Sequence, residues 1–331
     1  MRTLASLFCF AALFSSCTMK DTRTIATVER LDPALDAIVD NVVTFEIIAE
    51  GYEWSEGPLW LESTQTLIFS DVPKNTIYQW REGEKASVYL TPSGYTGTAP
   101  RTGETGSNGL TLDPAGNLVL AQHGDRRIAR MNAPLNTPKA DFVSIADNYQ
   151  GKKFNSPNDV VFRSNGDAFF TDPAYGLPQQ FEDPTREIMF QGVYKASHDS
   201  VTLVTDSLTR PNGVAFFPGE KTLLVSNSDP DKAAWYAFDL DENDSITNAR
   251  IFHDATSFTK NEKGLPDGMK FDKQGNLFAT GPGGVWIFNS EGKVLGKIKT
   301  AEISANCALS GDGKTLFITA DPWIIKVRLR K

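Results

Sequence analysis

Residues 264–280 read GLPDGMKFDKQGNLFAT: a tight polar turn, a short apolar run, a second turn and another short apolar run. Gly275 and Asn276 in the second turn, between two apolar runs, are typical of a β-hairpin. The acid Asp267 stands directly before the first of these runs. The segment therefore predicts a hairpin with a carboxylate at its mouth.

The same pattern occurs six times along the chain, each time with Glu, Asn or Asp before the first apolar run. These positions are Glu56, Asn108, Asn158, Asn212, Asp267 and Asn306, with steps of 52, 50, 54, 55 and 39 residues between them. Repeats of this length that contain several short strands are typical of propeller blades. We therefore predict an all-β fold over residues 42–331, a six-bladed β-propeller with four-stranded blades.

The sixth unit is incomplete, because only 26 residues (306–331) remain from its polar position to the last residue. The apolar segment at residues 43–49 is predicted to supply the missing outer strand. The two ends of the chain would then meet in one blade and close the ring. This pairing would also satisfy strand edges that are otherwise exposed.

The first sixteen residues are predicted to be a secretory signal, because one arginine precedes an apolar core that is too short to span a bilayer. Ser15 and Ser16 before Cys17 are similar to the lipobox of bacterial lipoproteins, in which the cysteine is lipidated and becomes the mature N-terminus. An ordinary cleaved signal is the alternative. We expect an exported protein, periplasmic or held at the membrane only through an N-terminal lipid.

Residues 17–41 are predicted to be a polar tether with a short helix. Pro33, with Asp32 before it as the N-cap, marks the start of that helix.

Composition excludes several classes of protein. The net charge is -8 and no long run of Lys or Arg occurs, so the basic footprint of a nucleic-acid-binding protein is missing. Of three cysteines, Cys9 and Cys17 lie in the first seventeen residues, which excludes a disulfide framework and a cysteine zinc site in the body. The sequence does not indicate an oligomeric state.

In a propeller the innermost strand of each blade begins near the central channel, so the six polar positions are expected to surround one opening. Two carboxylates and four amides, without histidine, form a hard oxygen donor set that suits Ca²⁺ better than Zn²⁺ or Cu²⁺. For any single position, the preference of Asn and Asp for turns is the simpler explanation. Six positions in register are harder to explain in that way. We predict Ca²⁺, with other divalent cations as alternatives.

The chain resembles the gluconolactonase and senescence-marker (regucalcin-like) family of six-bladed propellers, and within it the bacterial gluconolactonase branch. The motifs that carry the resemblance are EGPLW (56–60), SPNDV (156–160), RPNG (210–213), LPDGM (265–269), AQHGDRR (121–127), FTDPAYG (170–176) and GPGGV (281–285). The resemblance implies that four residues bind a central divalent cation: Glu56, Asn158, Asn212 and Asp267. Asn108 and Asn306 hold equivalent ring positions and are expected to line the channel.

The family resemblance also implies a reaction, the hydrolysis of a sugar lactone, a small-molecule substrate, by a metal-polarised carbonyl and an activated water. Asp267 is the favoured general base, with Asp159 and His123 as alternatives; a purely structural role for His123 is equally consistent with the sequence. Two alternative functions would be compatible with the same propeller: a phosphotriesterase-like hydrolase on the same metal, and a non-catalytic sugar-binding or protein-binding propeller.

Three further residues are expected near the mouth of the channel. Arg101 and Glu104 lie in a Gly- and Thr-rich loop at residues 94–106, which suits a substrate lid, although a plain surface loop would look the same. Tyr175 is a candidate for the pocket wall, with structural packing as the alternative.

Overall fold

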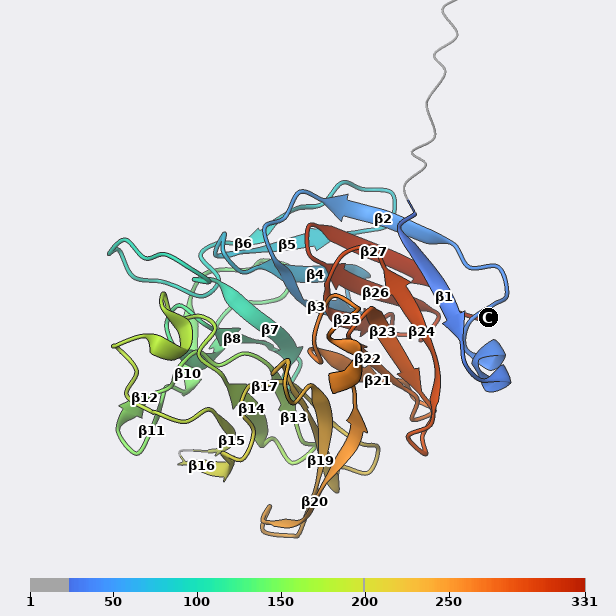
Figure 1. Ribbon diagram of the computed structural model, residues 1–331. Coiled ribbons are helices and arrows are strands. Elements are labelled where there is room, and N and C mark those ends of the chain that lie inside the picture. Colours follow the sequence, from blue (N-terminus) through green and yellow to red (C-terminus); the bar gives the residue numbers. More distant parts are fainter. Residues whose placement is uncertain (1–23, 199, 331) are drawn as a thin grey trace, which may run out of the picture.

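The computed structural model describes residues 24–198 and 200–330. Six antiparallel sheets of four or five strands are arranged around a central axis (Figure 1). This arrangement confirms the predicted all-β propeller with four-stranded blades. The predicted signal sequence and Cys17 lie outside the described residues. Within the described part of the chain, no helix is long and apolar enough to cross a membrane.

The blades follow one another along the chain. Blade 1 contains β3 (Ser55–Leu61), β4 (Thr66–Asp71), β5 (Thr76–Trp80) and β6 (Ser87–Leu90). Blade 2 contains β7 (Ser107–Leu112), β8 (Leu118–Gln122), β9 (Arg127–Met131) and β10 (Phe142–Ala146). Blade 3 contains β13 (Val160–Phe162), β14 (Ala168–Asp172), β15 (Gly192–Ser197) and β16 (Ser200–Thr205).

The second half of the ring repeats this order. Blade 4 contains β17 (Pro211–Phe216), β18 (Thr222–Asn227), β19 (Ala234–Leu240) and β20 (Ile246–Asp254). Blade 5 contains β21 (Met269–Phe271), β22 (Leu277–Gly281), β23 (Gly284–Phe288) and β24 (Val294–Thr300). Blade 6 contains β25 (Ser304–Leu309), β26 (Thr315–Ala320) and β27 (Trp323–Arg328). A small hairpin of β11 (Asn148–Tyr149) and β12 (Lys152–Lys153) lies between blades 2 and 3 in the sequence.

The N-terminal strand β2 (Phe45–Glu50) completes blade 6 by pairing antiparallel with β27, with Phe45 opposite Val327. Figure 1 shows this blue strand beside the red C-terminal strands. The predicted closure of the ring by residues 43–49 is confirmed. Closure pairs an N-terminal strand with the last strand of the chain, so the edge of β27 is covered by β2.

A second N-terminal strand, β1 (Ala26–Arg30), was not predicted. It pairs antiparallel with β24 and makes blade 5 a five-stranded sheet. Sequence analysis treated this segment as part of a tether because it is short and mostly polar. The predicted helix after it is a 3₁₀ helix, η1 (Pro33–Ala37), and the Asp32 side chain accepts a hydrogen bond from the Ala34 N–H at 2.8 Å, as expected for the N-cap.

The second strand of every blade is almost completely buried. In β4, β8, β14, β18, β22 and β26 all residues, or all but the first, are buried. Each of these strands is covered by the neighbouring blades on both faces, so it reads as a continuous apolar run instead of an alternating one. Packing between blades therefore holds the ring together and fixes where the inner strands begin.

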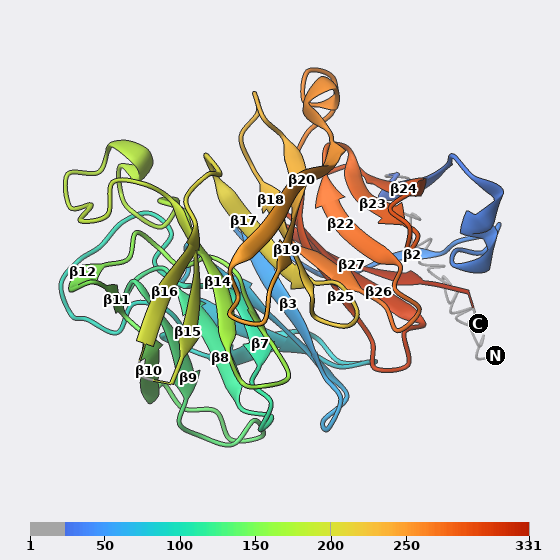
Figure 2. The same cartoon turned by 90° about the horizontal axis from the view of Figure 1, so that it is seen from below.

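The inner strands of the blades begin on one face of the ring, and this face also carries the longer connections. Figure 2 shows the yellow-green turn at η2 (Gln180–Glu182) and the orange turn at η3 (Thr256–Phe258) rising from the same side of the ring. The hairpin turn between β3 and β4 lies on the opposite side. The first side is therefore the one on which the loops meet the six predicted channel positions. These are called the ring residues below: Glu56, Asn108, Asn158, Asn212, Asp267 and Asn306.

The loop around η3 is fixed to blade 5 by the buried side chain of Lys297, which is 2% exposed. Its Nζ lies 3.0 Å from Glu262 Oε2, 3.7 Å from the ring centroid of Trp286 and 4.1 Å from that of Phe258. Replacing Lys297 with Ala removes both the ion pair and the two cation–π contacts. We expect the free energy of unfolding to fall by about 3 kcal/mol, measured by urea denaturation.

The matched control is Lys263→Ala, in the same loop, whose side chain is 69% exposed and lies 3.7 Å from Glu302. Its effect is expected to stay below about 1 kcal/mol. Equal effects of the two substitutions would contradict the role given to Lys297.

Candidate metal centre

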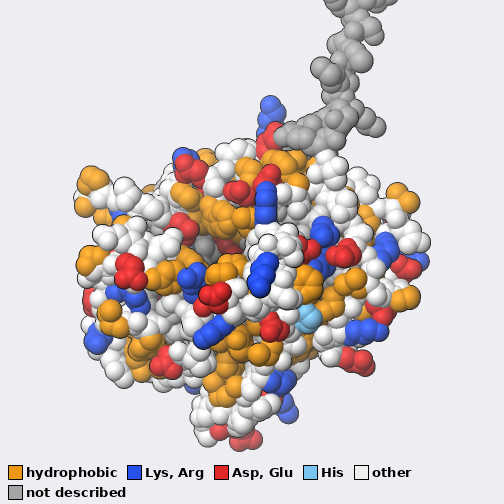
Figure 3. Space-filling model, in the orientation of Figure 1, with side chains coloured by type: hydrophobic (Ala, Val, Ile, Leu, Met, Phe, Trp, Pro, Cys, Tyr) orange, Lys and Arg blue, Asp and Glu red, His pale blue; other side chains and the backbone are white. Residues whose placement is uncertain are grey.

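A cavity of about 280 Å³ lies at the mouth of the central channel. Figure 3 shows a hollow near the middle of this face, with hydrophobic side chains at its border. The residues that line the cavity are Trp54, Glu56, Glu104, Asn108, Asn158, Tyr175, Asn212, Ser228, Gly264, Leu265, Asp267 and Ile303. All four predicted metal ligands are among them, so the structure brings these residues of four different blades together.

The inner strands change register where they carry ring residues. Irregularities follow Glu56 in β3 and flank Asn212 in β17, and similar shifts occur near Asn108 and Asn306. A bulge of this kind turns a side chain away from the regular alternation of the strand. The ring residues can therefore face the channel although their strands continue into the blade.

Glycines after the ring residues allow neighbouring blades to approach closely. A Cβ at Gly213 would lie 2.2 Å from the carbonyl oxygen of Asp267, and one at Gly268 would lie 1.9 Å from Cγ of Asn306. No larger side chain fits at either position without moving the adjacent blade. The Asn-Gly and Asp-Gly pairs in the sequence thus reflect blade packing around the channel as well as turn formation.

The Glu56 carboxylate is buried at the cavity wall. Its Oε2 accepts hydrogen bonds from the Gly57 N–H at 2.9 Å and from Asn306 Nδ2 at 3.3 Å. Burial, together with the nearby negative charges of Asp159 and Glu104, still raises the pKa of this carboxyl to about 8. The surrounding protein therefore disfavours the ionised form.

The Asp267 carboxylate shares this environment. Burial of the carboxyl group among protein atoms raises its pKa well above the usual range, and the charges of Glu56, Asp159 and Glu104 act in the same direction. Among the described residues that line the cavity, none is Lys or Arg. The cavity thus gathers acidic side chains without a protein cation to balance them when they ionise.

The amides supply neutral oxygen donors. Asn212 Nδ2 donates to Ser228 Oγ at 3.1 Å, while its Oδ1 is buried and has no hydrogen-bond partner among the described residues. The Oδ1 of Asn108 is also buried and unpartnered there. Buried acceptors of this kind are uncommon unless they bind something. Carboxylate and amide oxygens together match the donors that Ca²⁺ prefers, so the residues present fit this cation.

No group of three or more His, Cys, Asp or Glu side chains placed to hold a metal ion occurs in the described chain. The predicted donor set contains two such side chains, Glu56 and Asp267, and two asparagines.

The two alternative general bases lie behind the cavity wall. Asp159 is buried, and its carboxylate accepts hydrogen bonds from the N–H groups of Val160 at 2.9 Å and Val214 at 3.2 Å, which links blade 3 to blade 4. His123 is completely buried, with Nδ1 3.2 Å from Glu104 Oε2. Neither side chain lines the cavity.

The remaining predicted residues divide between the wall and its support. Asn108, Glu104 and Tyr175 line the cavity as expected. Asn306 stands one layer behind and donates to Glu56. Arg101 also lies off the wall: it donates to the carbonyl oxygens of Gly124 and, at 3.2 Å, of Gly176, and so connects the 94–106 loop to two other loops.

The model of the SMP-30/Gluconolactonase/LRE-like region family matches residues 54–321. The chain belongs to this family. A gluconolactonase of Zymomonas mobilis is 38% identical over 314 residues, which cover 93% of this chain and 87% of that protein.

Solved structures show the same architecture. A structure from Xanthomonas campestris, titled as a gluconolactonase important in glucose secondary metabolic pathways, has 28% identity and a TM-score of 0.77, covering 93% of this chain and 99% of that one. A calcium-binding regucalcin from Agrobacterium tumefaciens is 15% identical with a TM-score of 0.64, covering 86% of this chain and 94% of that one. At 15% identity, the similarity to the regucalcin shows a shared fold alone.

Sequence reasoning missed the apolar border of the cavity in this family member, formed by Trp54, Leu265 and Ile303. Each of these residues is adjacent, or nearly adjacent, in sequence to a blade's inner strand. Trp54 and Leu265 stand two residues before the predicted ligands Glu56 and Asp267, and this spacing is the one signal that would have indicated them.

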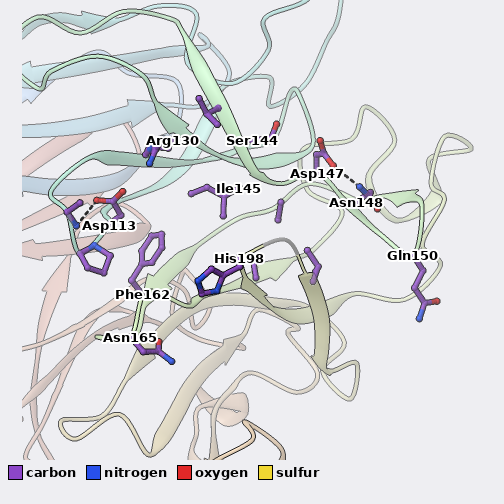
Figure 4. Close-up of a pocket in the computed structure, with 17 residues that line it drawn as sticks. Asp113, Arg130, Ser144, Ile145, Asp147, Asn148, Gln150, Phe162, Asn165 and His198 are labelled. Carbon is purple, nitrogen blue, oxygen red and sulfur yellow. Dashed lines mark hydrogen bonds between the residues drawn. The ribbon is translucent and has the colours of Figure 1, made fainter.

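A larger groove of about 850 Å³ lies on the outside of blades 2 and 3 and is lined by Asp113, Arg130 and His198 among others (Figure 4). Its acids are already engaged: Asp113 Oδ1 accepts from the Ala115 N–H at 2.9 Å, and Asp147 Oδ1 accepts from Asn148 Nδ2 at 2.7 Å. Figure 4 shows these side chains spread along an open surface instead of converging. The central cavity is therefore the candidate site.

Proposed function

We propose that this protein hydrolyses a sugar lactone with a Ca²⁺ ion held by Glu56, Asn158, Asn212 and Asp267. The observation that carries the proposal is the convergence of these four oxygen donors in one cavity that has no basic residue on its wall. The 38% identical gluconolactonase supports the lactone as the substrate. The cavity volume of about 280 Å³ suits a ligand of roughly one sugar ring, since it is at the small end of ligand sites.

The cation, when bound, would supply a Lewis acid that polarises the lactone carbonyl and stabilises the oxyanion. The four ligands would fix its position, and Asn306 would hold the Glu56 carboxylate from behind. The apolar border at Trp54, Leu265 and Ile303 would restrict the entry of water around the bound ring. Attack of one water on the carbonyl carbon then opens the ring to a hydroxy acid.

Calcium binding is expected to release protons. Because the pKa of Glu56 is raised to about 8 without a metal, this carboxyl is largely protonated at neutral pH, whereas a bound cation favours its ionised form. Calcium affinity should therefore increase as the pH rises from about 6 to 8. Calorimetric titrations in buffers of different ionisation enthalpy measure the released protons directly. Affinity that is independent of pH, with no proton release, would contradict the assigned environment of Glu56.

A substrate panel tests the proposed reaction against the other two functions. Sugar 1,5-lactones, sugar 1,4-lactones and an aryl phosphotriester are assayed with purified protein in the presence of Ca²⁺, and thermal unfolding is followed with and without the cation. We expect turnover of at least one sugar lactone. Turnover of the phosphotriester alone would indicate the phosphotriesterase-like function. Stabilisation by Ca²⁺ without hydrolysis of any compound would indicate a binding propeller.

We further propose that the protein is exported, as the N-terminal sixteen residues indicate. Mass spectrometry of the mature N-terminus from a bacterial host would test this and would show whether Cys17 carries a lipid.

A further inference from the structure

The cavity contains a third carboxylate that the proposed metal site does not use. Glu104 lies in the loop between β6 and β7, and it lines the central cavity together with Glu56 and Asp267. Its side chain is 27% exposed, and its carboxylate accepts no hydrogen bond from the described residues. Glu104 and Tyr175 also line the shallow depression immediately outside, so they stand where the cavity opens to solvent.

The loop that carries Glu104 is held at both ends. Asn75 Oδ1 accepts hydrogen bonds from the N–H groups of Ser93, Gly94 and Tyr95 at 3.1, 2.7 and 3.1 Å. At the other end the Gly106 N–H donates to the Val72 carbonyl at 2.7 Å. A carboxylate on a loop fixed in this way has a defined place relative to the cavity, as a reacting group requires.

His123 lies directly behind Glu104. Its Nδ1 is 3.2 Å from Glu104 Oε2, and its backbone N–H donates to the Gly106 carbonyl of the same loop at 3.1 Å. Both imidazole nitrogens are buried and neither makes a hydrogen bond to a described residue, so the 3.2 Å approach of Nδ1 to Glu104 is a close contact without hydrogen-bond geometry. A Cβ at Gly176 would lie 2.6 Å from Cβ and Cγ of His123, so the loop that carries Tyr175 also packs on this imidazole. The imidazole thus touches both loops at the cavity mouth.

We propose that Glu104 is the general base of lactone hydrolysis and that His123 is the positioning residue that orients its carboxylate. The inference rests on the proposed function. Glu56 and Asp267 are assigned to the cation, which would weaken them as bases, whereas Glu104 lines the same cavity and is not among the proposed ligands. With the proton on Nδ1, the imidazole would hold one carboxylate oxygen and leave the other for water.

The proposed step conserves atoms and charge. The Glu104 carboxylate takes a proton from water while the water oxygen forms a bond to the lactone carbonyl carbon. The tetrahedral intermediate then collapses with cleavage of the bond between this carbon and the ring oxygen. Glu104 returns the proton to the departing ring oxygen, which becomes a hydroxyl group. The products are the open hydroxy acid and the original carboxylate.

Two substitutions of Glu104 test the proposal with a lactone that the wild type hydrolyses. Glu104→Gln keeps the shape of the side chain and is expected to lower kcat by about 100-fold or more. Its calcium affinity, measured by calorimetry, should stay within about threefold of the wild type, because Glu104 is not a proposed ligand. Glu104→Ala should regain about tenfold in rate when formate is added, since formate can supply the missing carboxylate.

Glu53→Gln is the matched control, because Glu53 lines only the outer depression and not the central cavity, and its side chain is 54% exposed and paired with Lys74. Its kcat should equal that of the wild type. A Glu104→Gln enzyme with kcat within threefold of the wild type, or a Glu104→Ala enzyme that formate does not rescue, would overturn the proposal.

The role of His123 is tested in the same background. His123→Asn is expected to lower kcat about tenfold in the wild type and to cause no further loss in Glu104→Gln, because a positioning residue acts only through the residue it positions. A further tenfold loss in the double variant would overturn this role. A wild type without lactonase activity would overturn the proposed function and this inference together, whereas an active wild type with an equally active Glu104→Gln variant would overturn the inference alone.

Discussion

Asp267→Asn should reduce kcat/KM for the lactone by about 1000-fold or more and weaken calcium binding by at least tenfold. The substitution keeps the size of the side chain but removes one of two negative charges that the proposed site offers to the cation. Without the negative charge of Asp267 nearby, the Glu56 carboxyl ionises more readily in the metal-free protein. This change does not replace the lost ligand. Steady-state kinetics at saturating Ca²⁺ and calorimetry measure the two effects.

The control for Asp267→Asn is Asp40→Asn, which removes the same charge from an exposed site 3.5 Å from Arg330. This variant should behave as the wild type. An Asp267→Asn enzyme with activity within threefold of the wild type would exclude Asp267 both as a ligand and as part of the reaction.

Deletion of residues 24–50 should prevent cooperative folding. The deletion removes β2, which forms the outer strand of blade 6, and exposes the edge of β27. It also removes the buried side chains of Leu35 and Val39 and the partly buried Phe45 and Ile47, which pack in one cluster with blades 5 and 6. At about 1.5–3 kcal/mol for each fully buried side chain, the loss is comparable to the whole stability of a typical domain.

Denaturation followed by near-ultraviolet circular dichroism measures this effect, with a chain that begins at residue 24 as the control. The control should unfold in one cooperative transition. The same cooperative transition in the deleted chain would show that β2 does not close the ring.

Much of the fold could be predicted because the sequence repeat determines the number and order of the blades. Six apolar hairpins at regular steps have few arrangements that bury all of them, and a short last unit requires a strand from elsewhere in the chain. The strand β1 was not predicted because its sequence, ATVER, has no marked apolar side. Its pairing with β24 also depends on the path of the segment that follows it.

The inner ring of the site was also accessible from sequence, because the repeat sets a polar position at or just before the start of each inner strand. Glu56, Asn158, Asn212 and Asp267 meet in the cavity for this reason. Other positions depend on contacts between distant parts of the chain. Asn306 has the ring register but donates to Glu56 from behind the wall.

The pairing of His123 with Glu104 shows the same limit. Sequence analysis named both residues: it considered His123 either for direct catalysis or for a purely structural role, and Glu104 for the channel lining. The structure places the imidazole behind the wall and the carboxylate on it. This arrangement follows from the path of the 94–106 loop across the end of β8, which no local pattern encodes.

The most direct test of a calcium-dependent lactonase is the rate of lactone hydrolysis as a function of free Ca²⁺, with denatured protein as the blank for spontaneous hydrolysis. After a chelator has removed divalent cations, the enzymatic rate should fall by at least about 100-fold and should return when Ca²⁺ is added back. A rate that is unchanged after complete removal of divalent cations would contradict the proposed metal centre.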